Sequence, residues 1–153
     1  MADLTPPPIQ PASPFADLRA HHVAFRTPDF EQAKRWYVDT PDFRVVAEWP
    51  YGDIQLAFLA PPGDDGFYIE LFGGGAPSPV EARPWRDLND SLKYRGYHHV
   101  CFSVQDVEAT VATLRARGVN IALEPVVVTA IRRKIAFFTD PFGNFIELAE
   151  VVA

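Results

Sequence analysis

Two histidines and two glutamates recur in this chain at one spacing. Glu70 follows His22 by 48 residues, and Glu147 follows His99 by 48 residues. Imidazole nitrogens and carboxylate oxygens are ligands of divalent transition metals, and a carboxylate can also act as a general base. Two neutral imidazoles with two carboxylates would balance a dication and leave coordination positions open, as in a catalytic metal site.

The surroundings of these residues repeat as well. A constant shift of 77 residues places His21–Phe25 on His98–Phe102, Asp29 on Asp106, and residues 66–71 on residues 143–148. One ungapped offset aligns the start and the end of both halves. The sequence therefore predicts a duplicated module.

Each module is expected to have the order βαβββ. Asp29 and Asp106 are well placed to cap the helices, and Gly118 to end the second one. Hydrophobic periodicity predicts a helix that begins near residue 29 and another near residue 106, and strands over 18–27, 43–49, 54–60, 66–72, 97–105, 121–128, 131–138 and 144–151. The expected fold class is α+β, with two tandem modules forming a curved, partly closed mixed sheet around a metal cup.

The proline and glycine content indicates how the chain divides into a tail, two modules and a linker. Five of the 15 prolines lie in the first 14 residues, and Gly73-Gly74-Gly75 begins a second segment without hydrophobic periodicity. We therefore expect a Pro-rich tail over residues 1–16, module one over 17–74, a linker over 75–95 and module two over 96–153, with both modules forming one domain.

Strand alternation indicates which way the four residues point. Val23 and Phe25 would share the helix-facing side of the first strand, so His22 would lie on the opposite side. This opposite side faces the concave hollow of the curved sheet and is called the hollow side below. The same reasoning places Glu70, His99 and Glu147 on hollow sides, where burying carboxylates without a cation is costly. Four metal ligands are thus expected: His22, Glu70, His99 and Glu147. His21 and His98 would lie on the helix side as structural or rim residues.

Composition excludes several classes of partner. The 153 residues carry a formal charge of −6, which disfavours nucleic acid. Neither a signal peptide nor an apolar run of about 20 residues is visible, so we expect no membrane association. A single cysteine, Cys101, fits a reducing, cytoplasmic location. The exposed edges of small βαβββ modules favour pairing of modules within or between chains. A homodimer is expected, and the sequence leaves open whether the metal site is built within one chain or across the dimer.

These motifs resemble the vicinal oxygen chelate superfamily, which includes glyoxalase I, methylmalonyl-CoA epimerase, extradiol dioxygenases and antibiotic-resistance proteins. The resemblance covers residues from about 18 to 151, and its most specific segments are His98–Val104 and Phe138–Leu148. It implies a lyase or isomerase with one Zn, Ni, Co or Mn ion per site, which moves a proton next to a metal-bound carbonyl through an enolate. Glu147 resembles the glutamate that acts as base in glyoxalase I, and Glu70 would serve the opposite face.

The subclass remains open. Methylmalonyl-CoA epimerases usually carry glutamine at the position of Glu70, whereas the linker is longer than in compact bacterial glyoxalases and shows no evident glutathione clamp. The substrate would be a small carbonyl compound such as a thioester or a glutathione adduct. An extradiol dioxygenase would instead hold Fe(II) with His22, His99 and Glu147. A non-catalytic binding or resistance protein is the third alternative.

Candidate substrate contacts share the hollow faces. Arg26 could meet a substrate anion or be a surface arginine, and Glu48 is either a further base or a solvated strand end. Cys101 could touch substrate, although no basic neighbour marks it as a nucleophile. The expected substrate-binding set is Arg26, Tyr68, Phe72, Cys101 and Phe145.

Overall fold

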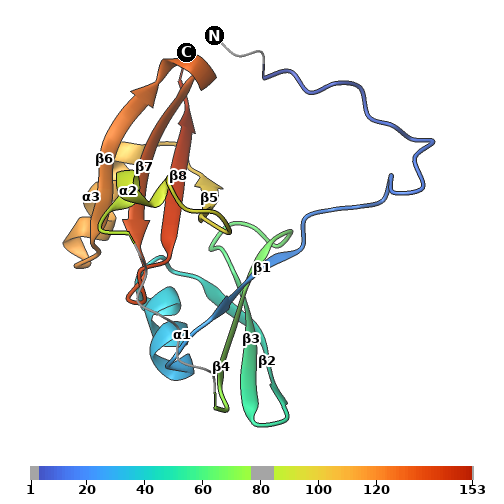
Figure 1. The fold of residues 1–153 in the computed structure, drawn as a ribbon, viewed down its shortest axis with the longest axis vertical. Coiled ribbons are helices and arrows are strands. Elements are labelled where there is room, and N and C mark those ends of the chain that lie inside the picture. The colour runs from blue at the N-terminus through green and yellow to red at the C-terminus, as the bar shows by residue number, and fades with distance from the viewer. Residues whose placement is uncertain (1–3, 77–84, 153) are drawn as a thin grey trace.

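The computed structural model describes residues 4–76 and 85–152, which fold into two four-stranded sheets with three α-helices (Figure 1). The strand orders are β1-β4-β3-β2 in one sheet and β5-β8-β7-β6 in the other. The two orders are equivalent, which confirms the α+β class and the tandem βαβββ modules. The sheets do not close into a single curved sheet within one chain.

Module one follows the predicted pattern closely. The helix begins after Asp29, whose carboxylate accepts a hydrogen bond of 2.9 Å from the backbone N–H of Gln32. The first strand starts later than expected, at His22. The elements are β1 (His22–Arg26), α1 (Phe30–Asp39), β2 (Arg44–Tyr51), β3 (Ile54–Ala60) and β4 (Tyr68–Gly74).

Module two repeats these elements after an additional short helix. Asp106 caps its longer helix, and Gly118 ends that helix with a φ of +80°, a conformation that glycine adopts without strain. The short helix α2 lies in the expected linker, of which residues 77–84 fall outside the described residues. The elements are α2 (Leu88–Ser91), β5 (His99–Ser103), α3 (Val107–Ala116), β6 (Ile121–Val128), a 3₁₀ turn η1 (Thr129–Ile131), β7 (Arg133–Thr139) and β8 (Phe145–Val151).

The helix-facing sides of the two sheets contribute to one hydrophobic core. Phe43 of module one contacts Phe102 of module two with ring centroids 5.6 Å apart, and Phe25 contacts Tyr97 at 6.0 Å. Both helices bury the apolar stripes expected from their periodicity: Phe30, Ala33 and Tyr37 on α1, and Val107, Val111 and Leu114 on α3. Because the modules meet through these faces, the opposite faces of both sheets point away from the shared core.

A buried polar contact also joins the modules. The hydroxyl of Tyr37, which is fully buried, donates a hydrogen bond of 3.2 Å to the carboxylate of Asp140. Burial raises the pKa of Tyr37 well above its ordinary value, and the Asp140 charge adds to this, so the hydroxyl keeps its proton. The buried carboxylate also accepts bonds from the backbone N–H groups of Phe142 and Asn144 and from the Asn144 amide.

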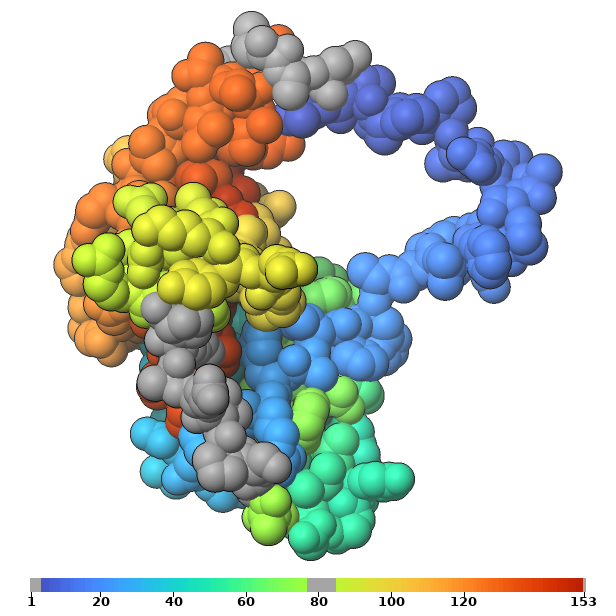
Figure 2. All heavy atoms as spheres, viewed as in Figure 1, coloured from blue at the N-terminus to red at the C-terminus, as the bar shows by residue number. Residues whose placement is uncertain are grey.

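The N-terminal segment extends away from both modules. Residues from 4 to about 20 form an arc beside the body of the molecule (Figure 2). Ile9 and Phe15 are 89% and 68% exposed, so this arc buries little apolar surface on its own chain. Among the described residues, no helix is both long and apolar enough to cross a membrane.

Replacing Tyr37 by phenylalanine should weaken the junction between the modules. Tyr37→Phe leaves the buried Asp140 carboxylate without one donor, and such a loss costs about 1–3 kcal/mol of unfolding free energy. Urea unfolding measures the change. Tyr51→Phe is the matched control because Tyr51 is 74% exposed, and an equal loss in both variants would contradict this role for Tyr37.

Candidate metal centre

Parallel pairing of the first and last strands brings each histidine next to its glutamate. In module one β1 pairs with β4, with Ala24 opposite Glu70, and in module two β5 pairs with β8, with Cys101 opposite Glu147. His22 Nε2 lies 3.5 Å from Glu70 Oε2, and His99 Nε2 lies 3.0 Å from Glu147 Oε2. The structure thus places each pair on one face of its sheet.

The donor atoms suit a divalent metal. Zinc binds histidine nitrogen and carboxylate oxygen at roughly 2.1 Å, and two such ligands at angles of about 90–115° have their donor atoms about 3.0–3.5 Å apart. The observed N···O separations of 3.0 and 3.5 Å fall in this interval. Both glutamate side chains are only 15% exposed, and none of the ion pairs found among the described residues joins either glutamate to lysine or arginine.

A phenylalanine supports each histidine from the neighbouring strand. Phe58 is opposite Glu70 in the β3–β4 register and packs against His22 at 5.4 Å, while Phe137 is opposite Glu147 and packs against His99 at 5.1 Å. The shift of 77 residues does not align these phenylalanines, because the loop before the last strand is two residues longer in module one. A comparison of the repeats that allowed a gap in this loop could have found them.

His21 and His98, which precede the candidate ligands His22 and His99, lie elsewhere than expected. His21 packs against Phe58 and Tyr68, and His98 stacks on Phe145, so both contact hollow-side aromatic rings rather than the helix side. The strands begin at His22 and His99, so the preceding residues are outside the alternation that was used to place them.

His21 and His98 contact the histidines that follow them, His22 and His99, through ring nitrogens. The two Nδ1 atoms are 2.7 Å apart between His21 and His22, and 2.7 Å apart between His98 and His99. His98 Nε2 additionally lies 2.8 Å from the hydroxyl oxygen of Ser91. Burial lowers the pKa of His98, as does the neighbouring His99, and both favour the neutral imidazole.

The two histidine–glutamate pairs do not meet within one chain. Across residues 4–76 and 85–152, no three side chains of the types His, Cys, Asp and Glu come close enough to hold a metal ion together. The reason is the shared core, which turns the hollow faces of the two sheets away from each other. Among the described residues, one chain therefore presents two separate histidine–glutamate pairs and not one four-ligand cluster.

The other candidate residues have varied surroundings. Arg26 donates a 2.7 Å hydrogen bond to the carbonyl oxygen of Gly74 and lies over the ring of Phe72. Tyr68 stacks on Phe58, and Phe145 is buried beneath Trp85 and His98. Glu48 forms an ion pair of 2.9 Å with Lys34, which favours the interpretation as a surface residue. Tyr68 lies beside His22 in the β1–β4 register and is partly exposed, and Cys101 is exposed and lies opposite Glu147.

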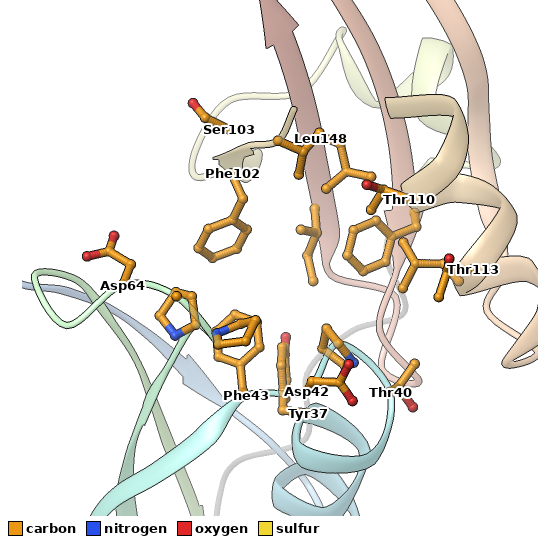
Figure 3. A pocket seen from close by; sticks show the side chains of 18 of the residues that line it. Tyr37, Thr40, Asp42, Phe43, Asp64, Phe102, Ser103, Thr110, Thr113 and Leu148 are labelled. Atoms are coloured by element: carbon orange, nitrogen blue, oxygen red, sulfur yellow. The ribbon is translucent and has the colours of Figure 1, made fainter. Parts of the chain in front are cut away.

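A cavity of about 690 Å³ lies between the modules, on the core side of the sheets (Figure 3). Aromatic rings line it together with hydroxyl groups of α3, and none of the four candidate ligands does. Cys101, on the edge strand β5, belongs both to this lining and to the face that carries Glu147. The cavity therefore lies between the modules and does not include the four candidate metal ligands.

The Cys101 thiol is held in its protonated form. Burial raises its pKa to about 12, and the Glu147 carboxylate contributes through its charge and through a hydrogen bond from the thiol. Cysteine nucleophiles need the opposite environment, in which a nearby cation lowers the thiol pKa. The raised thiol pKa does not favour Cys101 as a nucleophile, and the thiol donates a hydrogen bond to Glu147.

Comparison with known proteins identifies the family. The profile of the Glyoxalase/Bleomycin resistance protein/Dioxygenase superfamily matches residues 19–148, and the chain belongs to this superfamily. It is 31% identical over 136 residues to the uncharacterized protein YaeR of Escherichia coli K12, covering 86% of this chain and 95% of YaeR. It is 29% identical to a lactoylglutathione lyase of Haemophilus influenzae, covering 84% of this chain and 90% of that enzyme.

Solved structures give the same fold. The structure of SMU.1112c matches with a TM-score of 0.69 and 27% identity, covering 88% of this chain and 99% of that one. TnmS3, an antibiotic binding protein from Streptomyces sp. CB03234, matches with a TM-score of 0.64 and 25% identity, covering 88% and 96%. Five eukaryotic relatives with lactoylglutathione lyase or glyoxalase names are longer, and this chain spans 35–47% of their length.

Alkylation of Cys101 tests the electrostatics around the histidine–glutamate pair of module two. A thiol with a pKa of about 12 should react with iodoacetamide at pH 8 at least about tenfold more slowly than a free cysteine, because only the thiolate attacks. Glu147→Gln removes the negative charge and should speed the reaction several-fold in metal-free protein. Glu124→Gln, at an exposed glutamate paired with Arg115, is the control. Fast alkylation of the unaltered protein would contradict the assignment.

Proposed function

We propose that this chain is a metal-dependent, glyoxalase-like isomerase or lyase whose site forms between two copies of the chain. The observation that supports this most directly is the repeated histidine–glutamate pair, in which both N···O separations suit ligands of one ion. The homology to lactoylglutathione lyases agrees with it. His22 and Glu70 of one copy, with His99 and Glu147 of another, would provide the four ligands.

The arrangement of the sheets supports pairing between copies. β1 and β5 are edge strands, each paired on one side only, and they carry His22 and His99. Setting β1 of one copy beside β5 of a second copy would bring two hollow faces together. Applying the same contact twice around a twofold axis gives a closed homodimer with two equivalent sites.

The chemistry assigned to the site is proton transfer next to a carbonyl. A bound divalent ion would polarise the carbonyl and stabilise the negative charge that develops on its oxygen. Glu147 would take the proton from the carbon beside the carbonyl, and one of the two glutamates would return a proton to the acceptor carbon. Because Glu70 and Glu147 come from opposite modules, they would reach the substrate from two sides. Phe58 and Phe137 would limit the entry of water beside the histidines.

A binding protein is the second candidate. The likeness to an antibiotic binding protein at 25% identity favours it, as does the apolar cavity of about 690 Å³ between the modules. Ligand binding of this kind would not depend on His22, Glu70, His99 or Glu147. The intact set of four ligand-type residues at equivalent positions favours the enzyme.

The hemithioacetal of glutathione and an α-ketoaldehyde is the first substrate to test, with a CoA thioester bearing an acidic α-proton as the second. Protein loaded with Ni²⁺ or Zn²⁺ should isomerise the substrate or exchange its proton with deuterium from the solvent. Glu147→Gln and Glu70→Gln should each lower the rate by about 10²–10⁴-fold at saturating metal, as expected for the loss of a general base. Glu124→Gln should not change it.

Three other outcomes would contradict the proposal. Metal-free protein that turns over or exchanges these substrates as fast as loaded protein would remove the role of the ion. Bound iron with oxygen uptake on a catechol would favour a ring-cleaving dioxygenase. Ligand affinity that survives metal removal and all four ligand substitutions, without any exchange, would favour the binding protein.

A further inference from the structure

The Ser91–His98–His99 chain of contacts has a defined direction of hydrogen bonding. The hydroxyl of Ser91 donates its single proton to the carbonyl oxygen of Leu88 at 2.6 Å. The hydroxyl oxygen can therefore only accept from His98 Nε2, which lies 2.8 Å away. His98 Nε2 must carry a proton, so Nδ1 of the neutral His98 ring is an acceptor.

This direction extends to the candidate ligand. His98 Nδ1 lies 2.7 Å from His99 Nδ1, so His99 must donate from Nδ1. A neutral His99 with its proton on Nδ1 has a lone pair on Nε2, and this lone pair faces the Glu147 carboxylate at 3.0 Å, an arrangement that a cation between the two atoms would stabilise. The opposite arrangement would let His99 Nε2 donate to Glu147, but Ser91 would then have to donate to His98 Nε2 and the Ser91–Leu88 hydrogen bond would be lost.

The residues that start this chain are held firmly. Ser91 is 1% exposed and lies on α2, whose N-terminus is capped by the carboxylate of Asp87. Leu88 packs in a small apolar cluster with Phe137 and Phe145. Phe145 in turn stacks on the ring of His98 at 5.7 Å. The position and the ring plane of His98 are thus fixed by packing before any ligand binds.

Module one lacks the equivalent anchor. His21 and His22 show the same Nδ1···Nδ1 contact of 2.7 Å, but His21 is exposed and is surrounded by the rings of Phe58 and Tyr68. Within the described part of the chain, no hydroxyl is found at Nε2 of His21 that would set its direction. The two histidine–glutamate pairs therefore differ in how strongly their tautomers are determined.

We propose that Ser91 and His98 are positioning residues that hold His99 in the tautomer presenting its Nε2 lone pair, and so prepare the histidine–glutamate pair of module two for a metal ion. The inference rests on the proposed metal-dependent function and adds two residues to it. It also gives the segment between the modules a role at the site, because α2 supplies Ser91.

The first test reads the tautomers without metal. Nitrogen-15 NMR of histidine-labelled, metal-free Glu147→Ala protein, which lacks the carboxylate that competes for His99 Nε2, should at alkaline pH show His98 protonated on Nε2 and His99 protonated on Nδ1. Adding Ser91→Ala should shift His99 toward a mixture of tautomers. Overturning results are His99 protonated on Nε2 in Glu147→Ala, or unchanged tautomers when Ser91→Ala is added.

The second test measures Zn²⁺ affinity by competition with a chelator. His98→Leu removes the acceptor for His99 Nδ1–H and should weaken binding about 10–100-fold, the usual effect of losing a group that orients a ligand. His98→Asn can still accept that hydrogen bond and should bind nearly as tightly as the unaltered protein. The matched change in module one, His21→Leu, should weaken binding less than His98→Leu. Equal losses for His98→Asn and His98→Leu would overturn the positioning role.

The proposed metal-dependent function and the positioning role of Ser91 and His98 can be told apart by how they fail. If the unaltered protein does not bind Zn²⁺, Ni²⁺, Co²⁺ or Mn²⁺, the proposed function fails and the metal-binding role of this chain of contacts fails with it. If the unaltered protein binds metal and neither Ser91→Ala nor His98→Leu changes tautomer or affinity, only the positioning role fails.

Discussion

The site depends on the parallel pairing of the first and last strands in each module. This pairing sets residues 48 positions apart beside each other, so a histidine near the start of β1 or β5 meets a glutamate on β4 or β8. Strand alternation then puts both side chains on the face opposite the helix. The helix supplies the apolar surface that keeps this face orientation, because reversing it would bury the histidine and the glutamate in the core and expose the apolar residues.

The second constraint is the shared core between the modules. The aromatic contacts of Phe43 and Phe102, together with the Tyr37–Asp140 hydrogen bond, hold the helix-bearing faces together. The same packing directs the two hollow faces outward, so within the described residues the two histidine–glutamate pairs of one chain stay apart. Each pair has one carboxylate and one imidazole, and two such pairs together would balance a divalent cation. In the proposed function, the packing that stabilises the monomer thus also makes a second copy necessary for a complete site.

Much of a single module was predictable from the sequence. The repeat, the helix caps at Asp29 and Asp106 and the order of the strands follow from local signals that the structure confirms. The packing of one module against the other was not predictable, because periodicity shows which face of an element is apolar but not which apolar faces meet. The four residues of α2 were missed because one helical turn in a segment rich in glycine and proline shows no periodic pattern. His21 and His98 were assigned to the wrong side because each lies just before its strand.

Subunit mixing tests the central claim, that the metal centre forms between module one of one copy and module two of another. One variant would carry His22→Ala with Glu70→Ala, and the other His99→Ala with Glu147→Ala, so that neither variant alone can form a complete site. After equal amounts exchange subunits, half of the dimers are mixed and each holds one intact site, so metal binding should return to about a quarter of that of the unaltered protein. Recovery at this level, absent from each variant alone, is the expected result. Tight binding by either variant alone, or no recovery after exchange is shown to be complete, would contradict the account.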